Sequence, residues 1–385
     1  MRWRTGASQR QDAALALQRR HWLAAAVSGA VGGALGLALP SGASLAQGPQ
    51  AAPAAPVLPP DRALQRIALG SCIDQAREQT MWEPTLALRP DLFIFGGDNV
   101  YASTQPWSPA KLNAAYAQLA THAGFRRLRD TVPHLAIWDD HDYGVNDGGA
   151  EFAHKAESKQ AFLNFWQVPA DDPRRTREGL HHAQVFGPPG RRVQVILLDV
   201  RWFRSAWKRT DQRDAPGRER YLPDESPDRQ MLGEAQWQWL AAQLREPADV
   251  RLIVSGIQVV VEGHGWEGWR LFPRERERLW RAVREARANG VVFLSGDRHV
   301  GALYRNDQGT PYPFYEMTSS GMTHPWRDAS EPGPNRLGPL LTEHHVGVVD
   351  IDWPARRLTL ALHDAQGRAR QARTISFDEL QVKNP

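Results

Sequence analysis

Residues 135–147 read LAIWDDHDYGVND, an apolar run typical of a buried strand followed at once by four acidic residues and a histidine. Three other apolar runs end in a similar way: IALGSC at residues 67–72, FIFGGDNVY at residues 93–101 and VFLSGDRH at residues 292–299. In folds built on parallel strands, ligands bind at the loops that follow the carboxyl ends of the strands. We therefore expect the thiol, phenol, carboxylate and imidazole groups of these loops to gather at one end of a sheet.

The hydrophobic pattern around these loops predicts an α/β fold. Short apolar runs indicate strands at residues 67–69, 92–95, 134–138, 193–198, 252–254, 291–294 and 347–351. Helical periodicity lies between them at residues 109–128, 151–166, 228–245 and 274–289. Buried strands separated by helices are typical of largely parallel sheets covered by helices. Residues 170–192 and 205–228 are predicted as surface excursions, and the last forty residues as antiparallel strands that complete a sheet.

The N-terminal segment has the features of an export signal. Paired arginines at positions 19 and 20 precede a stretch rich in Ala and Gly at residues 24–39, and small residues end at Ala46. This arrangement resembles a twin-arginine signal peptide with cleavage near Ala46. The alternative is a membrane anchor, but the apolar run is shorter than the ~20 residues that span a bilayer. We therefore expect the twin-arginine machinery to export the protein to the periplasm or beyond, with no stable membrane anchor after cleavage.

The rest of the chain is expected to form one domain. Residues 47–65 are rich in Pro and Ala and predict an extended linker. Residues 66–385 contain all four strand-to-loop junctions and predict a single catalytic domain. The chain has 47 Lys and Arg against 43 Asp and Glu, but residues 1–46 carry five of the arginines and one of the acids. The net charge of the remainder is near zero, which argues against a nucleic-acid partner.

The acidic loops predict a bound metal. Asp139 and Asp140 are adjacent, and Asp98 and Asp297 each follow a predicted strand and are expected nearby. Carboxylates crowded into one site repel each other unless a cation neutralises them. Cys72 is the only cysteine in the sequence, so it cannot form an intramolecular disulfide. A single cysteine is often an inert core residue, but its place among these loops favours a role as a metal ligand.

The four motifs together resemble those of the PhoD-type alkaline phosphatases and phosphodiesterases, a branch of the calcineurin-like metallophosphoesterases. The wider superfamily uses Asp-x-His, Gly-Asp-x-x-Asp, Gly-Asn-His-Asp/Glu and Gly-His-x-His. Here Cys72 stands at the His of the first motif and Tyr101 at the last Asp of the second, while residues 140–142 and 296–299 supply the others. The resemblance covers residues 66 to about 363. It implies an αββα four-layer β-sandwich of mixed sheets flanked by helices, and because the motifs begin soon after the linker we expect no separate N-terminal β domain.

The resemblance also implies ligands for two or more metal ions, Fe³⁺ with Ca²⁺. Thiolate and phenolate ligands, here Cys72 and Tyr101, suit a highly charged ion such as Fe³⁺. Asp98 can bridge two cations. Oxygen ligands suit Ca²⁺, and Asp140 with Asn146 is expected to supply them. Asp297 and His299 can reach adjacent metal positions. Zn²⁺ at both positions is the alternative.

The expected reaction is hydrolysis of phosphomonoesters or phosphodiesters by in-line attack of a metal-bound hydroxide. Asp98 and His141 are the predicted catalytic residues, with His141 donating a proton to the leaving alkoxide or stabilising the charge on phosphorus. The alternative for His141 is a structural histidine that bonds its neighbours. Arg201 and Arg204 follow a buried strand and resemble the family's substrate-binding arginine segment. The alternative for Arg201 is a structural pair with Asp199. Gln258 is expected to lie behind the metal ligands without binding a metal itself. His264 and His324 are expected to be structural or to lie at the rim of the site.

Three other functions are compatible with parts of the pattern. A phospholipase D-like enzyme would use the same site on lipid diesters. A non-catalytic metal- or phosphate-binding envelope protein would lack Asp98 or His141, and both are present. A papain-like cysteine hydrolase would need Cys72 at a helix N-terminus or beside a paired imidazole, whereas it follows a strand.

Overall fold

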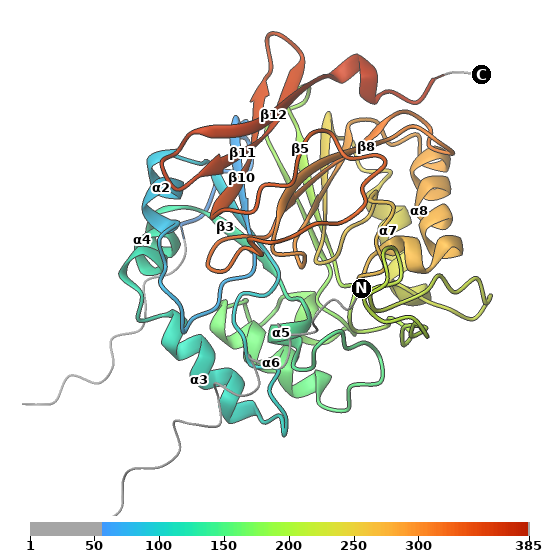
Figure 1. The fold of residues 1–385 in the computed structure, drawn as a ribbon. Helices are drawn as coiled ribbons and strands as arrows, with labels where there is room; N and C mark the ends of the chain where they lie inside the picture. Colours follow the sequence, from blue (N-terminus) through green and yellow to red (C-terminus); the bar gives the residue numbers. More distant parts are fainter. Residues whose placement is uncertain (1–55, 384–385) are drawn as a thin grey trace, which may run out of the picture. The chain divides into compact units, whose positions relative to one another are not determined.

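The computed structural model describes residues 56–383, which fold around two six-stranded mixed sheets (Figure 1). The first sheet has the order β12-β11-β10-β1-β2-β3. Its strands are β1 (Arg66–Gly70), β2 (Leu92–Gly96), β3 (His134–Ile137), β10 (His345–Asp352), β11 (Arg357–Asp364) and β12 (Ala369–Ser376). Strands β1 to β3 are parallel, and β10 to β12 pair antiparallel with β1 and with each other. The prediction that the C-terminal strands complete a sheet is confirmed.

The second sheet has the order β4-β5-β6-β7-β9-β8. Its strands are β4 (His182–Phe186), β5 (Val193–Leu198), β6 (Val250–Ser255), β7 (Val291–Ser295), β8 (Gly301–Asn306) and β9 (Phe314–Ser319). The four central strands are parallel, whereas β4 and β8 pair antiparallel at the edges. Strand β4 lies within residues 170–192, which the sequence pattern predicted as a surface excursion. Its side chains are mostly half-buried, so it lacks the apolar run that marks the central strands.

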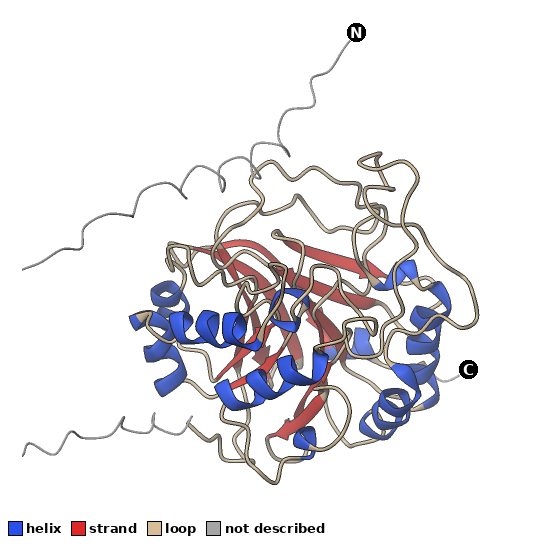
Figure 2. Ribbon diagram, turned by 90° about the horizontal axis from the view of Figure 1, so that it is seen from below, coloured by secondary structure: helices blue, strands red, loops and turns tan. Residues whose placement is uncertain are grey.

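Helices cover the outer faces of both sheets (Figures 1 and 2). The helical elements are α2 (Trp82–Ala87), α3 (Pro109–Leu119), α4 (Ala123–Thr131), α5 (Asp140–Tyr143), α6 (Lys155–Phe165), η1 (Pro173–Arg175), α7 (Gly233–Gln243), η2 (Trp269–Leu271), α8 (Pro273–Glu285) and η3 (Phe377–Leu380). Together with the two sheets, they confirm the predicted four-layer mixed α/β sandwich. The single helix predicted at residues 109–128 is instead two helices, α3 and α4, because the chain turns at residues 120–122.

Aromatic side chains attach the helices to the sheets. Trp82 of α2 packs against Phe93 and Phe95 of β2, with ring centroids 6.2 and 6.3 Å apart. On the other sheet, Trp280 of α8 packs against Phe293 of β7 at 5.8 Å. Burying each of these large rings stabilises the fold by several kcal/mol, about 25 cal/mol per Å² of apolar surface. The strands that carry the acidic loops are thus held in a rigid core.

The structure describes only the last part of the predicted linker, residues 56–65. Residues 1–55, which contain the predicted signal and the start of the linker, lie outside the described residues. Residues 56–65 differ from the prediction of a free linker, because Leu58 and Leu64 are buried in the core. Arg62 pairs with Asp91 at 2.5 Å, which fixes the segment at the start of β2.

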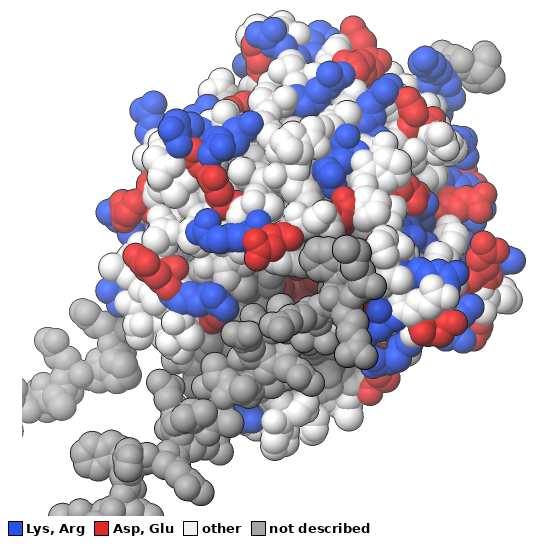
Figure 3. All heavy atoms as spheres, in the orientation of Figure 1, with Lys and Arg blue, Asp and Glu red and all other residues white. Residues whose placement is uncertain are grey.

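The described surface carries charges of both signs. On the coloured part of the face in Figure 3, Lys and Arg are interspersed with Asp and Glu. This mixture agrees with the near-zero net charge calculated for residues 47–385. Within residues 56–383, every helix is too short or too polar to cross a bilayer.

Candidate metal centre

The predicted loops converge where the two sheets meet. The Ser71 hydroxyl, just after β1, donates to the Ser319 carbonyl at the end of β9 over 2.9 Å. The Ser319 hydroxyl donates back to the Leu69 carbonyl of β1 over 3.0 Å. These reciprocal bonds join the first sheet to the second, so loops from both sheets face one site.

Five residues of these loops other than glycine adopt left-handed backbone conformations, among them Asp147 with φ of 54°. Cys72, Asp98, Asp297 and His299 have φ values of 60°, 48°, 66° and 54°. A positive φ is uncommon for residues other than glycine and is often concentrated at functional sites. Gly97 has φ of 111°, and a Cβ there would lie 2.6 Å from the Asp139 Cβ. Glycine therefore allows the loops after β2 and β3 to approach closely.

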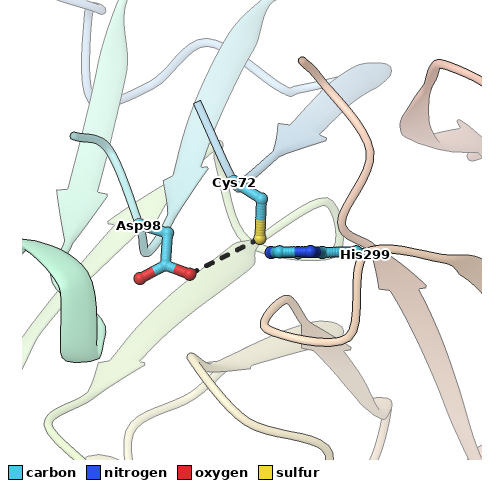
Figure 4. A group of neighbouring side chains, drawn as sticks. All are labelled: Cys72, Asp98 and His299. Carbon is cyan, nitrogen blue, oxygen red and sulfur yellow. Dashed lines mark hydrogen bonds between the residues drawn. The ribbon is translucent and has the colours of Figure 1, made fainter. Parts of the chain in front are cut away.

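The first group of potential ligands is Cys72, Asp98 and His299 (Figure 4). One ligand atom from each lies within 4.8 Å of the others, and the Cys72 Sγ is 3.6 Å from the Asp98 Oδ2. The Tyr101 hydroxyl adds a fourth donor atom, 3.4 Å from the Asp98 Oδ2 and 3.0 Å from the His299 Nε2. The arrangement combines thiol, phenol, imidazole and carboxyl groups around one point.

Two further groups extend the site on the other side of Asp98. One contains Asp98, Asp140 and His141, and the next contains Asp139, Asp140 and Asp297. The Asp139 Oδ2 and Asp140 Oδ1 are buried without a hydrogen-bond partner. Buried polar atoms are nearly always satisfied, so each exception needs an explanation. A cation between these oxygens would satisfy both, and the oxygen-rich donor set fits a hard ion.

The electrostatics of the cluster support this interpretation. Burial and the repulsion of Asp140 raise the pKa of Asp98 well above its usual value. Burial also raises the pKa of Asp139 to about 7, against the opposing effect of Arg201, and raises the pKa of the Cys72 thiol to about 11. The pKa of Asp140 is lowered to about 2, because His141 and Arg201 outweigh its burial. A cation would favour the ionised form of each ligand.

The side chain of Arg201 lies in a carboxylate network behind this cluster. Its Nε donates to the Asp139 Oδ1 at 2.6 Å, and its Nη atoms donate to both Glu267 oxygens at 2.8 and 2.9 Å. The side chain is fully buried. This geometry differs from the predicted phosphate clamp and from the alternative pair with Asp199, which bonds the Arg201 backbone N–H instead. Arg201 therefore fixes the orientation of a candidate ligand.

Arg204 and Asn146 also differ from their predicted roles. Arg204 is buried and donates to the carbonyls of Ser205 and Asp147 at 2.7 and 2.6 Å. Asn146 is exposed at the rim. Its neighbour Asp147, with φ of 54°, donates its backbone N–H to the Asp140 Oδ2 at 2.7 Å. The left-handed turn brings Asp147 rather than Asn146 into a group with Asp140 and Glu267.

Two histidines flank the Tyr101 ring. The His141 ring centroid is 4.1 Å from that of Tyr101, and its Nδ1 is 2.7 Å from the Ser103 hydroxyl. This contact leaves Nε2 as the nitrogen that can meet a substrate. The His324 ring centroid is 4.7 Å from that of Tyr101. His324 thus borders the site, as expected for a rim residue.

Gln258 and His264 form a buried structural pair. The His264 Nε2 lies 2.8 Å from the Gln258 Oε1, and the Gln258 amide donates to the Thr318 hydroxyl at 2.9 Å. Both side chains are fully buried. They bond each other and not the acidic cluster, so His264 has the expected structural role. Within the described residues, the hydrogen bonds of Gln258 join it to no candidate metal ligand, which differs from the position behind the ligands that the sequence predicted.

Sequence reasoning missed several polar residues around the cluster. Asp147 and Glu267 join the acidic groups, and the Ser320 hydroxyl lies 3.0 Å from the Cys72 Sγ. Asp147 is the last residue of the acidic segment 135–147, so a local sequence signal marks it. Glu267 and Ser320 lie in loops without a motif, and only the fold brings them near. Asp139 lies among the crowded acids of the same loop, but the predicted ligand set does not include it, whereas the structure groups it with Asp140 and Asp297.

One cavity lies beside the cluster and another lies away from it. The first, about 430 Å³, is lined by Asp147 and the aromatic residues Phe152, Trp207 and Tyr221. The second, about 940 Å³, is lined by residues such as Arg66 and lies at the amino end of β1. Ligands of parallel sheets bind at the carboxyl ends of strands, so the smaller cavity is the one relevant to the site.

Comparison with known proteins places this geometry in a family. The model of the PhoD-like phosphatase family matches residues 68–335. Alkaline phosphatase D of Bacillus subtilis (strain 168) is 24% identical over 204 residues, covering 48% of this chain and 34% of that protein. The aligned part thus spans about a third of the length of this curated relative.

Two solved structures share the fold. The structure of PhoD has a TM-score of 0.64 at 15% identity, covering 84% of this chain and 70% of that one. Purple acid phosphatase PPD1 from yellow lupin seeds has a TM-score of 0.55 at 12% identity, covering 84% of this chain and 55% of that one. The family match includes all four strand-to-loop junctions of the cluster. The chain therefore belongs to the PhoD-like phosphatase family.

Proposed function

We propose that the protein hydrolyses phosphate esters at a centre of two or more cations. The observation that carries this proposal is the position of Asp98, which belongs to both the Cys72–His299 group and the Asp140–His141 group. A carboxylate has two oxygens and can serve both groups at once. Its Oδ2 faces the Cys72 Sγ, while its Oδ1 accepts the His141 backbone N–H at 3.1 Å.

The donor atoms divide into two sets of different chemistry. Cys72, Tyr101, Asp98 and His299 would hold a highly charged ion, and Fe³⁺ fits their thiolate and phenolate character. Carboxylates on the other side, including Asp140, fit Ca²⁺. Zn²⁺ in both positions is the alternative. Such cations, when bound, polarise the phosphoryl group and lower the pKa of a water.

The surrounding residues supply orientation and a proton. Ser103 holds the Nδ1 of His141, so Nε2 can face the leaving oxygen of a bound ester and protonate it. Arg201 keeps Asp139 in place from behind, with its guanidinium shielded from water. The Asp147 backbone N–H does the same for Asp140.

Replacement of Asp98 tests this function. In Asp98→Asn, loss of a shared carboxylate is expected to remove both cations and to lower kcat/KM by more than the ~10–100-fold that follows loss of an outer partner. Metal content is measured by mass spectrometry and activity with p-nitrophenyl phosphate, before and after treatment with a chelator. Asp74→Asn, which changes an acid outside these ligand groups, is the control. A protein that binds phosphate and metal but turns over no ester would be a binding protein, and the proposal would be wrong.

The cavity beside Asp147 favours phosphodiesters among the possible substrates. Its volume of about 430 Å³ and its aromatic lining suit an organic group on the far side of the phosphorus. We expect a higher kcat/KM for bis(p-nitrophenyl) phosphate than for the monoester. Cleavage of phospholipid vesicles without cleavage of either small ester would replace this proposal with the phospholipase D-like alternative.

An absorption spectrum tests the nature of the first cation. A tyrosinate- or thiolate-to-iron band in the visible range is expected, and the Tyr101→Phe variant should change it. A colourless protein that contains only zinc and is fully active would support the zinc alternative.

We also propose export through the twin-arginine route. The support is the sequence of residues 1–46, with Arg19 and Arg20 before an apolar run. The double variant Arg19→Lys/Arg20→Lys should retain the uncleaved protein in the cytoplasm. The mass of the exported protein should correspond to a chain that begins near Gln47. Unchanged export of the variant would contradict this route.

A further inference from the structure

Ser320 connects the two loops that carry Cys72 and His299. It directly follows β9 and is fully buried. Its hydroxyl oxygen lies 3.0 Å from the Cys72 Sγ and accepts the backbone N–H of His299 at 2.6 Å. One side chain from the second sheet therefore contacts both the thiol group after β1 and the loop of a candidate ligand.

The proton of this hydroxyl can be assigned from its neighbours. A serine hydroxyl has one proton to donate and two lone pairs. A backbone N–H can only donate, so Ser320 uses a lone pair toward His299 and keeps its proton for the sulfur. Ser71 lies 3.5 Å from the same sulfur, but it gives its proton to the Ser319 carbonyl at 2.9 Å. Of these two serines, Ser320 is the donor to the sulfur.

The backbone of Ser320 is fixed by a buried histidine from the first sheet. The His345 Nδ1 lies 2.7 Å from the Glu343 carbonyl, which can only accept, so Nδ1 carries the proton. The Nε2 then accepts the Ser320 N–H at 3.1 Å. The next residue, Gly321, packs closely against the imidazole, since a Cβ there would be 2.2 Å from the His345 Cε1. The hydroxyl is thus held in one position before any cation binds.

We propose that Ser320 is a positioning residue that donates a hydrogen bond to the Cys72 thiolate and so sets the electron density that the sulfur offers to its cation. The inference rests on the proposed cation centre. Hydrogen bonds to a ligating sulfur, like other contacts behind metal ligands, tune the properties of the metal. His345 contributes by holding the Ser320 backbone.

The test uses Co²⁺ alone as the probe, added to the metal-free protein. A cobalt-bound thiolate gives a sulfur-to-cobalt charge-transfer band whose energy depends on the electron density at sulfur. Ser320→Ala removes the hydrogen bond, so the band is expected to move to longer wavelength. Ser71→Ala removes the other hydroxyl near this sulfur. Because that hydroxyl donates its proton to the Ser319 carbonyl and not to the sulfur, this variant should leave the band unchanged.

A second pair of variants separates the hydrogen bond from packing. Ser320→Thr and Ser320→Val introduce side chains of nearly the same shape that differ in the hydroxyl, so Thr should keep the parent band and Val should show the shift. Circular dichroism checks folding, and this pair stands if the Ala variant does not fold. The same band position in Thr and Val, with cobalt bound in both, would overturn the role of Ser320. The absence of any sulfur-to-cobalt band in the parent would overturn it together with the proposed centre.

Discussion

The Nε of Arg201 donates to the Oδ1 of Asp139 at 2.6 Å, with both side chains withdrawn from water. The Nη1 and Nη2 atoms of the same guanidinium donate two parallel hydrogen bonds to the Glu267 carboxylate. Bidentate pairs of this kind are strong and geometrically specific. Arg201 therefore acts through Asp139, at the back of the acidic cluster, and does not face a substrate.

Loss of Arg201 should destabilise the fold as well as the site. Arg201→Ala leaves the Asp139 and Glu267 carboxylates buried without their counter-ion, which costs about 3–5 kcal/mol of unfolding free energy. Urea unfolding measures this loss. A phosphate clamp would behave differently, with a raised KM and an unchanged free energy of unfolding, and that result would contradict the geometry. Arg209→Ala, an exposed arginine at the cavity, is the matched control.

Cys72→Ala should lower the cation content of the protein while the fold is retained. The alanine leaves a small cavity that costs about 1 kcal/mol, so the free energy of unfolding in chelator should change little. Cation content and activity should both fall, because Cys72 supplies one of the ligand atoms in the group that it forms with Asp98 and His299. Mass spectrometry measures the metal. Full metal content in this variant would show that Cys72 is an inert core residue.

The sequence predicted the strands and acidic loops well because both signals are local. Apolar runs such as residues 93–95 mark a strand, and the acids follow directly. Contacts between distant loops have no such signal. Nothing near Glu267 indicates that it meets Arg201, and the positive φ that turns Asp147 rather than Asn146 inward depends on the folded loop. Ser320 likewise reaches Cys72 only because β9 and β1 end side by side.

His134 should make stability depend on pH in the acidic range. Burial lowers its pKa to about 4 from a usual value near 6.5. Between these values the unfolded chain binds a proton that the folded chain does not, so stability is fully present above pH ~6.5 and is lost as the pH falls toward 4. In His134→Gln, the slope of the free energy of unfolding against pH in this range should be smaller by up to ~1.4 kcal/mol per pH unit. Phe95→Leu, which alters a ring 5.7 Å away but keeps the imidazole, should retain the slope.

The cavity beside Asp147 can be tested from its exposed edge. Ala206 lines the cavity and is exposed, so Ala206→Trp can narrow it without disturbing the core. We expect KM for bis(p-nitrophenyl) phosphate to rise about tenfold, which corresponds to ~1.4 kcal/mol, while kcat/KM for the monoester stays within about twofold. Lys208→Trp places the same ring two residues away, at an exposed position that does not line the cavity. If Ala206→Trp lowered kcat/KM equally for both esters, the cavity would not hold the second ester group. The same conclusion would follow if Lys208→Trp raised KM for the diester as much as Ala206→Trp does. A selective loss in Ala206→Trp alone would place that group in this cavity, whose lining includes the rings of Phe152 and Tyr221.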